Sequence, residues 1–138
     1  MTIVVGYVPK PEGDAALLRA VDEARLRGED LVVVNAASGD ALTDASYASD
    51  AQLAAVRDRL ASAGVAYELL HAVVGRDPAV HLVEVADDRG ASLLVIGLRR
   101  RTSVGKFLLG SSASVILMRA SCPVLAVKGP AKEHRLHR

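Results

Sequence analysis

A loop at residues 97–112 combines glycine and serine at positions suited to holding an anion. It begins at Gly97, where an apolar run ends, and finishes at Gly110, Ser111 and Ser112, where a helical stretch starts. Glycine allows a ligand to approach the backbone closely, although it also serves ordinary tight turns. Unpaired N–H groups at a helix start attract phosphate, and serine there is also a common N-cap. The spacing therefore predicts a phosphate-binding loop.

Two arginines of this loop, Arg99 and Arg100, add positive charge. A guanidinium can donate charge-assisted hydrogen bonds to phosphate, but an arginine run in a loop is also typical of a solvated surface. Both interpretations stay open for Arg100. The loop is not a Walker A sequence, since Arg100 and Phe107 stand where that motif needs a glycine and a hydroxyl. A dinucleotide fingerprint is also absent after the first apolar run, at residues 3–6.

The elements that must position this loop follow from the pattern of apolar residues. Short β-branched runs alternate with stretches of helical period, which is typical of an α/β domain with a parallel sheet. Gly28, Gly64 and Gly90 each follow a helical stretch, where a left-handed residue ends a helix. Asp77 and Asp14 are predicted N-caps. Strands are expected at residues 2–6, 31–36, 65–71, 92–97 and 123–128.

Composition limits the possible partners. The chain has 138 residues, 51% of them hydrophobic, with a net charge of +1 and 3% aromatic residues. These values predict one soluble domain and favour neither nucleic acid nor a membrane as partner. The start runs directly into a strand and Cys122 has no second cysteine, so we expect a cytoplasmic location. Residues 37–49 are predicted to form a mobile loop over the site, and residues 129–138 a disordered basic tail.

The loop and its surroundings resemble the universal stress protein family. Its ATP-binding members carry G-x2-G-x9-G-[ST] after the fourth strand, and this chain has Gly97, Arg100, Gly110 and Ser111 at those positions. Three of the four positions match, and a serine-cysteine-proline-valine sequence follows at residues 121–124. The opening TIVVG and the later LVVVNA also fall in the family's order. The resemblance covers roughly residues 2–128.

The resemblance implies a fold and a ligand. The fold would be a single-domain, open, twisted five-stranded parallel sheet of order 3-2-1-4-5 with helices on both faces, adenine-nucleotide alpha-hydrolase-like. Ligands of such sheets bind where the strand order reverses, here between the first and fourth strands. ATP, with Mg, would be the cofactor, and Asn35 and Ala36 would flank the adenine. The nucleotide site would comprise Tyr7, Val8, Asn35, Ala36, Gly97, Arg99, Arg100, Gly110, Ser111 and Ser112.

The last predicted strand would leave an apolar edge open to solvent, which favours pairing with a second copy. Family members commonly dimerise through this strand, so the resemblance also implies a homodimer with a two-fold contact. The predicted interface residues are Val124, Leu125, Ala126 and Val127.

Two hypotheses for function remain. In the first, the protein is a regulatory module that binds an adenine nucleotide and signals to an unknown partner, as the retained Gly97, Gly110 and Ser111 suggest. In the second, it has lost nucleotide binding and acts as a dimeric interaction module, because Val8 replaces the family's usual acidic residue. No nucleophile and base can be assembled, so we expect no enzyme, while slow ATP hydrolysis stays open. A phospho-receiver domain is disfavoured, because its acidic cluster is missing.

Overall fold

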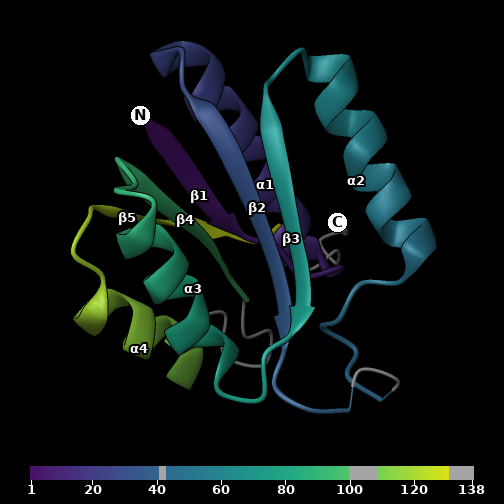
Figure 1. Cartoon of the computed structure of the whole chain (residues 1–138), viewed down its shortest axis with the longest axis vertical. Helices are drawn as coiled ribbons and strands as arrows, with labels where there is room; N and C mark the ends of the chain where they lie inside the picture. The colour runs from purple at the N-terminus through teal and green to yellow at the C-terminus, as the bar shows by residue number, and fades with distance from the viewer. Residues whose placement is uncertain (41–42, 100–108, 131–138) are drawn as a thin grey trace, which may run out of the picture.

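Five parallel strands form one sheet in the order β3-β2-β1-β4-β5 (Figure 1). The computed structural model describes residues 1–40, 43–99 and 109–130. Strand order reverses between β1 and β4, as the family resemblance implied. The elements in chain order are β1 (Thr2–Gly6), α1 (Pro11–Arg27), β2 (Asp30–Ala37), α2 (Asp50–Ala63), β3 (Tyr67–Val73), α3 (Pro78–Asp88), β4 (Leu93–Leu98), α4 (Ser111–Arg119) and β5 (Val124–Lys128).

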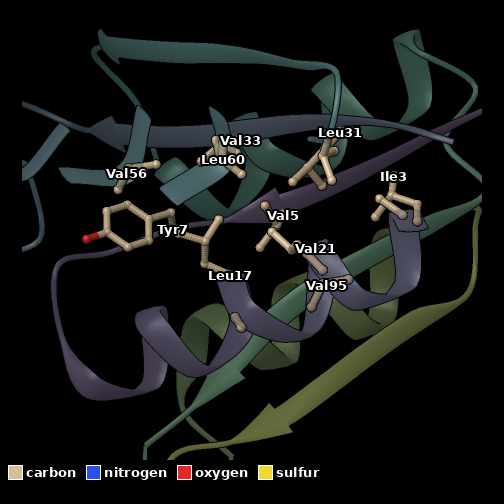
Figure 2. Packing of buried hydrophobic residues seen from close by; sticks show 14 of the residues in the cluster. Ile3, Val5, Tyr7, Leu17, Val21, Leu31, Val33, Val56, Leu60 and Val95 are labelled. Atoms are coloured by element: carbon tan, nitrogen blue, oxygen red, sulfur yellow. The ribbon is translucent and has the colours of Figure 1, made fainter. Parts of the chain in front are cut away.

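The central strands are buried on both faces because helices cover the sheet from two sides. Along β1, Ile3 and Val5 point to the face covered by α1 and α2, and Val4 points to the face covered by α3 and α4. Figure 2 shows the first of these layers, in which Leu17 of α1 and Leu60 of α2 meet the sheet. This double covering explains why the strands read as continuous apolar runs rather than as alternating ones.

The helix ends match the predicted signals with one exception. Gly28, Gly64 and Gly90 have φ of 65°, 70° and 58°, the left-handed values that glycine adopts readily. The Asp77 carboxylate caps α3 by accepting a hydrogen bond from the N–H of Ala79. The prediction that Asp14 caps the first helix is wrong. Helix α1 already begins at Pro11, whose missing N–H and fixed φ suit the first helical position, and the N-cap is Lys10.

Strand β3 lies two residues later than predicted. Val65 follows the αL residue Gly64 and packs into the core at the end of α2 instead of pairing with a strand. Pairing starts at Tyr67, opposite Leu31, and continues to Val73. An apolar residue just beyond a glycine cap commonly packs back on its helix. Val65 makes this contact with α2, although its β-branched side chain suggested the start of the strand.

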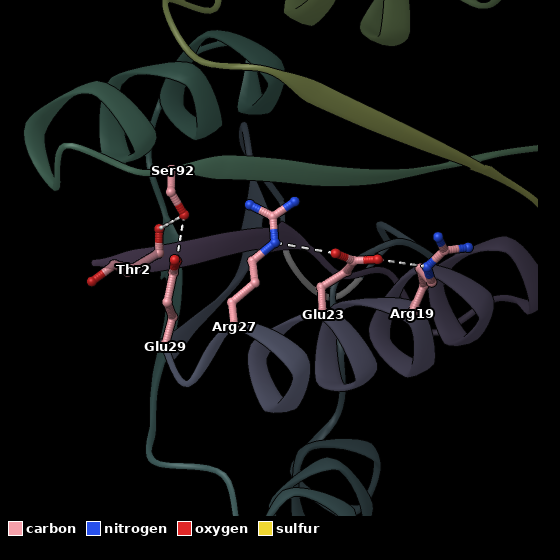
Figure 3. Close-up of polar contacts among 6 residues, drawn as sticks. All are labelled: Thr2, Arg19, Glu23, Arg27, Glu29 and Ser92. Carbon is pink, nitrogen blue, oxygen red and sulfur yellow. Dashed lines mark hydrogen bonds and ion pairs between the residues drawn. The ribbon is translucent and has the colours of Figure 1, made fainter.

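The charged contacts drawn in Figure 3 lie along α1 and at the amino ends of the strands. Glu23 accepts hydrogen bonds from Arg19 at 3.0 Å and from Arg27 at 3.2 Å. These two hydrogen bonds hold the pKa of the Glu23 carboxyl below its usual value, and the bond from Arg19 has the larger effect. Ser92, the residue before β4, donates a hydrogen bond to the Glu29 carboxylate.

The helices in the described part of the chain are too short or too polar to span a membrane.

Candidate functional site

A cavity of about 170 Å³ opens at the carboxyl ends of β1 and β4, where the strand order reverses. Gly6 and Val8 border it from the end of β1, and Ile96 and Gly97 from β4. The first turns of α1, α3 and α4 complete its wall. A cavity at this point of an open parallel sheet is the usual ligand position of such folds.

One side of the cavity is apolar. Ala36 at the end of β2 faces Pro78, Ala79 and Leu82 from the first turns of α3. Each of these side chains offers only van der Waals contact. This side therefore suits a flat, weakly polar group such as a heterocyclic base.

The other side carries the N-terminus of α4. Gly110 is its N-cap with φ −70° and ψ 169°, no side chain caps it, and its first turn holds no acidic residue. Ser111 and Ser112 are exposed there, and Ser112 lines the cavity. Helix α3, in contrast, has Asp77 as its cap. Within the described part of the chain, the first N–H groups of α4 thus remain available to an anion, which the helix dipole also favours.

Gly97 is required by packing inside the protein. A Cβ at this position would lie 2.2 Å from the carbonyl oxygen of Glu12, so only glycine lets the first turn of α1 rest on β4. At Gly110, a Cβ would meet no described atom within 4 Å. The sequence left open whether each glycine admits a ligand to the backbone or serves a tight turn. For Gly97 the close neighbour is α1, whereas Gly110 stands open at the start of α4.

Asn35 does not line the cavity, in contrast to the prediction that it flanks the ligand. Its side chain is fully buried on the face of α1 and α2, while the next residue, Ala36, lines the cavity. The Asn35 amide donates to the carbonyl oxygens of Tyr7 and Ser46, both at 2.8 Å, and its oxygen accepts from the N–H of Ala48 at 2.9 Å. Asn35 therefore ties the following loop to the end of β1.

The described residues of the loop at 37–49 lie at this end of the sheet, and none of them lines the cavity. Tyr47 stacks on His71 of β3 with ring centroids 4.1 Å apart, and Lys10 donates to the Ser46 hydroxyl at 3.0 Å. The described residues of this loop therefore do not cover the cavity, in contrast to the expected position over the site. Because this segment is polar and has no apolar periodicity, its sequence did not predict these side-chain contacts.

Tyr7 borders the cavity from the end of β1, but its ring packs in the core beside Leu17 and Val56 (Figure 2). Burial raises the pKa of the Tyr7 hydroxyl, and the neighbouring Asp14 raises it further. The phenol therefore stays protonated at neutral pH and cannot act as a base.

The remaining predicted residues are placed as follows. Arg99 is exposed directly after β4, and Arg100 lies outside the described residues, as do residues 101–108 of the loop and 131–138 of the tail. Burial raises the pKa of the partly buried Cys122 thiol, which keeps it protonated and agrees with a packing role. The described ranges contain no group of three or more potential metal ligands among His, Cys, Asp and Glu.

The sequence reasoning missed Glu12 and Gly13, which line the cavity from the first turn of α1. Gly13 packs so closely on the end of β1 that a Cβ would lie 1.8 Å from the carbonyl oxygen of Val8. Pro11 is the sequence signal that could have revealed them, because proline favours the first helical position. A helix that begins at Pro11, three residues before Asp14, places Glu12 in its first turn, at the edge of the sheet.

The profile of the Universal stress protein family matches residues 1–128. The chain belongs to this family. A Universal stress protein of Mycolicibacterium smegmatis (strain ATCC 700084 / mc(2)155) is 44% identical over 126 residues, which cover 91% of this chain and 96% of that protein.

Solved structures of universal stress proteins agree with the fold. That of the Archaeoglobus fulgidus protein in complex with dAMP has a TM-score of 0.73 and 27% identity, covering 93% of this chain and 98% of that one. A universal stress protein in complex with cAMP has a TM-score of 0.68 and 29% identity, covering 94% and 98%. The five-stranded parallel sheet of order 3-2-1-4-5 is thus the shared fold of these family members and this chain.

Proposed function

We propose that this universal stress protein is a regulatory module that binds ATP or another adenine nucleotide between β1 and β4, and that it is not an enzyme. The observation that carries the proposal is the uncapped N-terminus of α4, which opens on the cavity at the reversal of strand order. The dAMP and cAMP complexes of family members support this choice of ligand. Among the described residues of the cavity, the Ser112 hydroxyl has no hydrogen bond to a base that would activate it as a nucleophile.

The two sides of the cavity fit the two parts of a nucleotide. The base would lie on the apolar side, against Ala36 and the first turns of α3. The phosphates would lie at Ser111 and Ser112, at the start of α4, with Gly97 of β4 and Arg100 of the loop after β4 completing the contacts. Magnesium would come with the phosphates of ATP, since the described residues hold no metal-ligand cluster of their own.

Saturating ATP should stabilise the protein, and the variant Gly110→Val should abolish that stabilisation. At roughly 100 times its dissociation constant, a ligand adds about 2.7 kcal/mol to the free energy of unfolding. The valine would stand over the first N–H groups of α4 without meeting any described atom within 4 Å of its Cβ, so the fold should persist. Thermal unfolding of both proteins with and without ATP measures the effect. An equal shift in the variant would place the phosphates elsewhere.

The alternative function is that of a dimeric interaction module without nucleotide. The observation that favours it is Val8, which lines the cavity and can offer a ligand only apolar contact. The thermal experiment separates the two functions. If millimolar ATP, ADP and AMP leave the unfolding temperature of the natural protein unchanged, the interaction module becomes the better assignment.

We also propose that the protein forms a homodimer through β5, which is the edge strand next to β4. Leu125 and Val127 pack on the layer of α1, and Val124 and Ala126 on that of α3 and α4. The side chains of the predicted interface therefore stabilise each subunit, and the backbone edge would make the contact. The substitution Leu125→Asp would disturb the core as well, so a backbone change is the better probe.

The variant Ala126→Pro should convert such a dimer to monomer. Gly129 donates to the Leu98 carbonyl and Leu94 donates to the Pro123 carbonyl, so residues 123, 125, 127 and 129 point their backbone groups toward β4. By alternation, the N–H of Ala126 points outward. Proline removes this donor and leaves the bonds to β4 in place. Light scattering should give a monomer for Ala126→Pro and a dimer for Ala126→Ser, and a monomeric natural protein would contradict the proposal.

A further inference from the structure

Glu12 is the one carboxylate among the described residues that line the cavity. It stands in the first turn of α1, where Gly13 packs on the end of β1 and the Glu12 carbonyl lies above Gly97 of β4. Its Cβ would lie 3.3 Å from a Cβ placed on Gly129, just after β5. These backbone contacts fix the residue at the edge of the sheet, between the end of β1 and the ends of β4 and β5.

Within the described ranges, the Glu12 carboxylate is without a partner. No described residue donates a hydrogen bond to it or forms an ion pair with it, although the side chain is partly buried. The other acidic residue of the same turn, Asp14, is exposed and interacts with Tyr7 instead. A carboxylate accepts hydrogen bonds and donates none, so a ligand that covers Glu12 has to supply donors to it.

The position of Glu12 limits which part of a ligand can donate hydrogen bonds to its carboxylate. The apolar side of the cavity lies at Ala36 and α3, beyond β1, and the anion-binding N-terminus of α4 lies on the side of β4. A phosphate close to Glu12 would be repelled, and a cation site would need more oxygen ligands than one carboxylate. The group that joins a base to a phosphate in a nucleotide is a sugar with hydroxyl donors.

We propose that Glu12 accepts hydrogen bonds from the ribose hydroxyls of the bound nucleotide and thereby selects ribonucleotides over their deoxy forms. This inference rests on the proposed nucleotide function and adds the sugar specificity of the site. A site that hydrogen-bonds a substrate hydroxyl discriminates against the analogue that lacks it, because its own polar group is then left unpaired.

Calorimetry with AMP and 2′,3′-dideoxy-AMP tests the proposal, in buffer with EDTA so that no magnesium takes part. The natural protein should bind AMP at least tenfold more tightly, since a hydrogen bond to a charged group typically contributes that much or more. In Glu12→Gln this preference should shrink to about threefold or less, with dideoxy-AMP affinity nearly unchanged. The matched variant Asp14→Asn removes the same charge from the same helical turn and should keep the full preference.

Three outcomes would overturn the inference while leaving the proposed function intact. The natural protein could bind both nucleotides equally, Glu12→Gln could weaken both by the same factor, or Asp14→Asn could lose the preference as well. An effect of Glu12→Gln seen only when magnesium is added would assign the carboxylate to the cation instead. If the natural protein binds neither AMP nor ATP at millimolar concentration, both the proposed function and the sugar specificity fall.

Discussion

Replacing Gly97 by alanine is expected to lower the free energy of unfolding by about 2–3 kcal/mol, the cost of forcing an atom into a filled space. The new Cβ would lie 2.2 Å from the carbonyl oxygen of Glu12 and 2.7 Å from its carbonyl carbon. Because the clash is with backbone, it can be relieved only by moving the first turn of α1 away from β4. Urea unfolding measures the change.

Gly39→Ala is the matched control for Gly97→Ala. A Cβ at Gly39 would meet no described atom within 4 Å, and its φ is not positive, so the same change of residue should alter stability by less than about 0.5 kcal/mol. Equal stabilities of the two variants would show that α1 does not rest on β4 through Gly97. The glycine would then have to be explained by the ligand alone.

Asn35→Leu is expected to cost about 3 kcal/mol or more, although the shape of the side chain is nearly kept. The leucine leaves the carbonyl oxygen of Tyr7 and the N–H of Ala48 without their partner in a buried position, and the carbonyl oxygen of Ser46 in a partly buried one. Each buried polar group left unpaired costs about 1–3 kcal/mol. Urea unfolding gives the total, and hydrogen exchange at the Ala48 amide should become much faster.

Thr43→Val provides the comparison for Asn35→Leu. It also replaces a polar side chain of the same loop region by an apolar one of similar shape, but the bond that it removes, to the Asp40 carbonyl, is exposed. The change should therefore stay within about 0.5 kcal/mol. If Asn35→Leu were no more destabilising than Thr43→Val, the three hydrogen bonds of the Asn35 side chain would not be what holds the loop.

The fold was predictable because local signals agreed along the chain. Apolar runs gave the strands, and three glycines with positive φ marked the ends of the helices before β2, β3 and β4. The two errors concern the N-cap of α1 and the start of β3, and at each place a neighbouring residue determined the boundary. Pro11 started α1 before Asp14, and Val65 packed behind the cap of α2 instead of opening β3.

The site was less predictable, because spacing along the chain does not show to which face a side chain points. The predicted Val8, Ala36, Gly97 and Ser112 do line the cavity, but Asn35 alternates to the opposite face. Glu12 was missed because its place depends on how α1 packs on Gly97 across the sheet. Such a contact between distant segments has no periodic signal.

The pairing of β1 with β4 has a kinetic consequence. It joins Ile3 to Leu93, so the loop that closes when these strands meet contains three helices and two other strands. Contacts between residues so distant in sequence form late in folding, because the entropy of a long loop is lost before they stabilise the chain. The cavity exists only once that pairing is complete. A ligand bound there would consequently slow unfolding while leaving the folding rate almost unchanged, and so would prolong the lifetime of the folded protein.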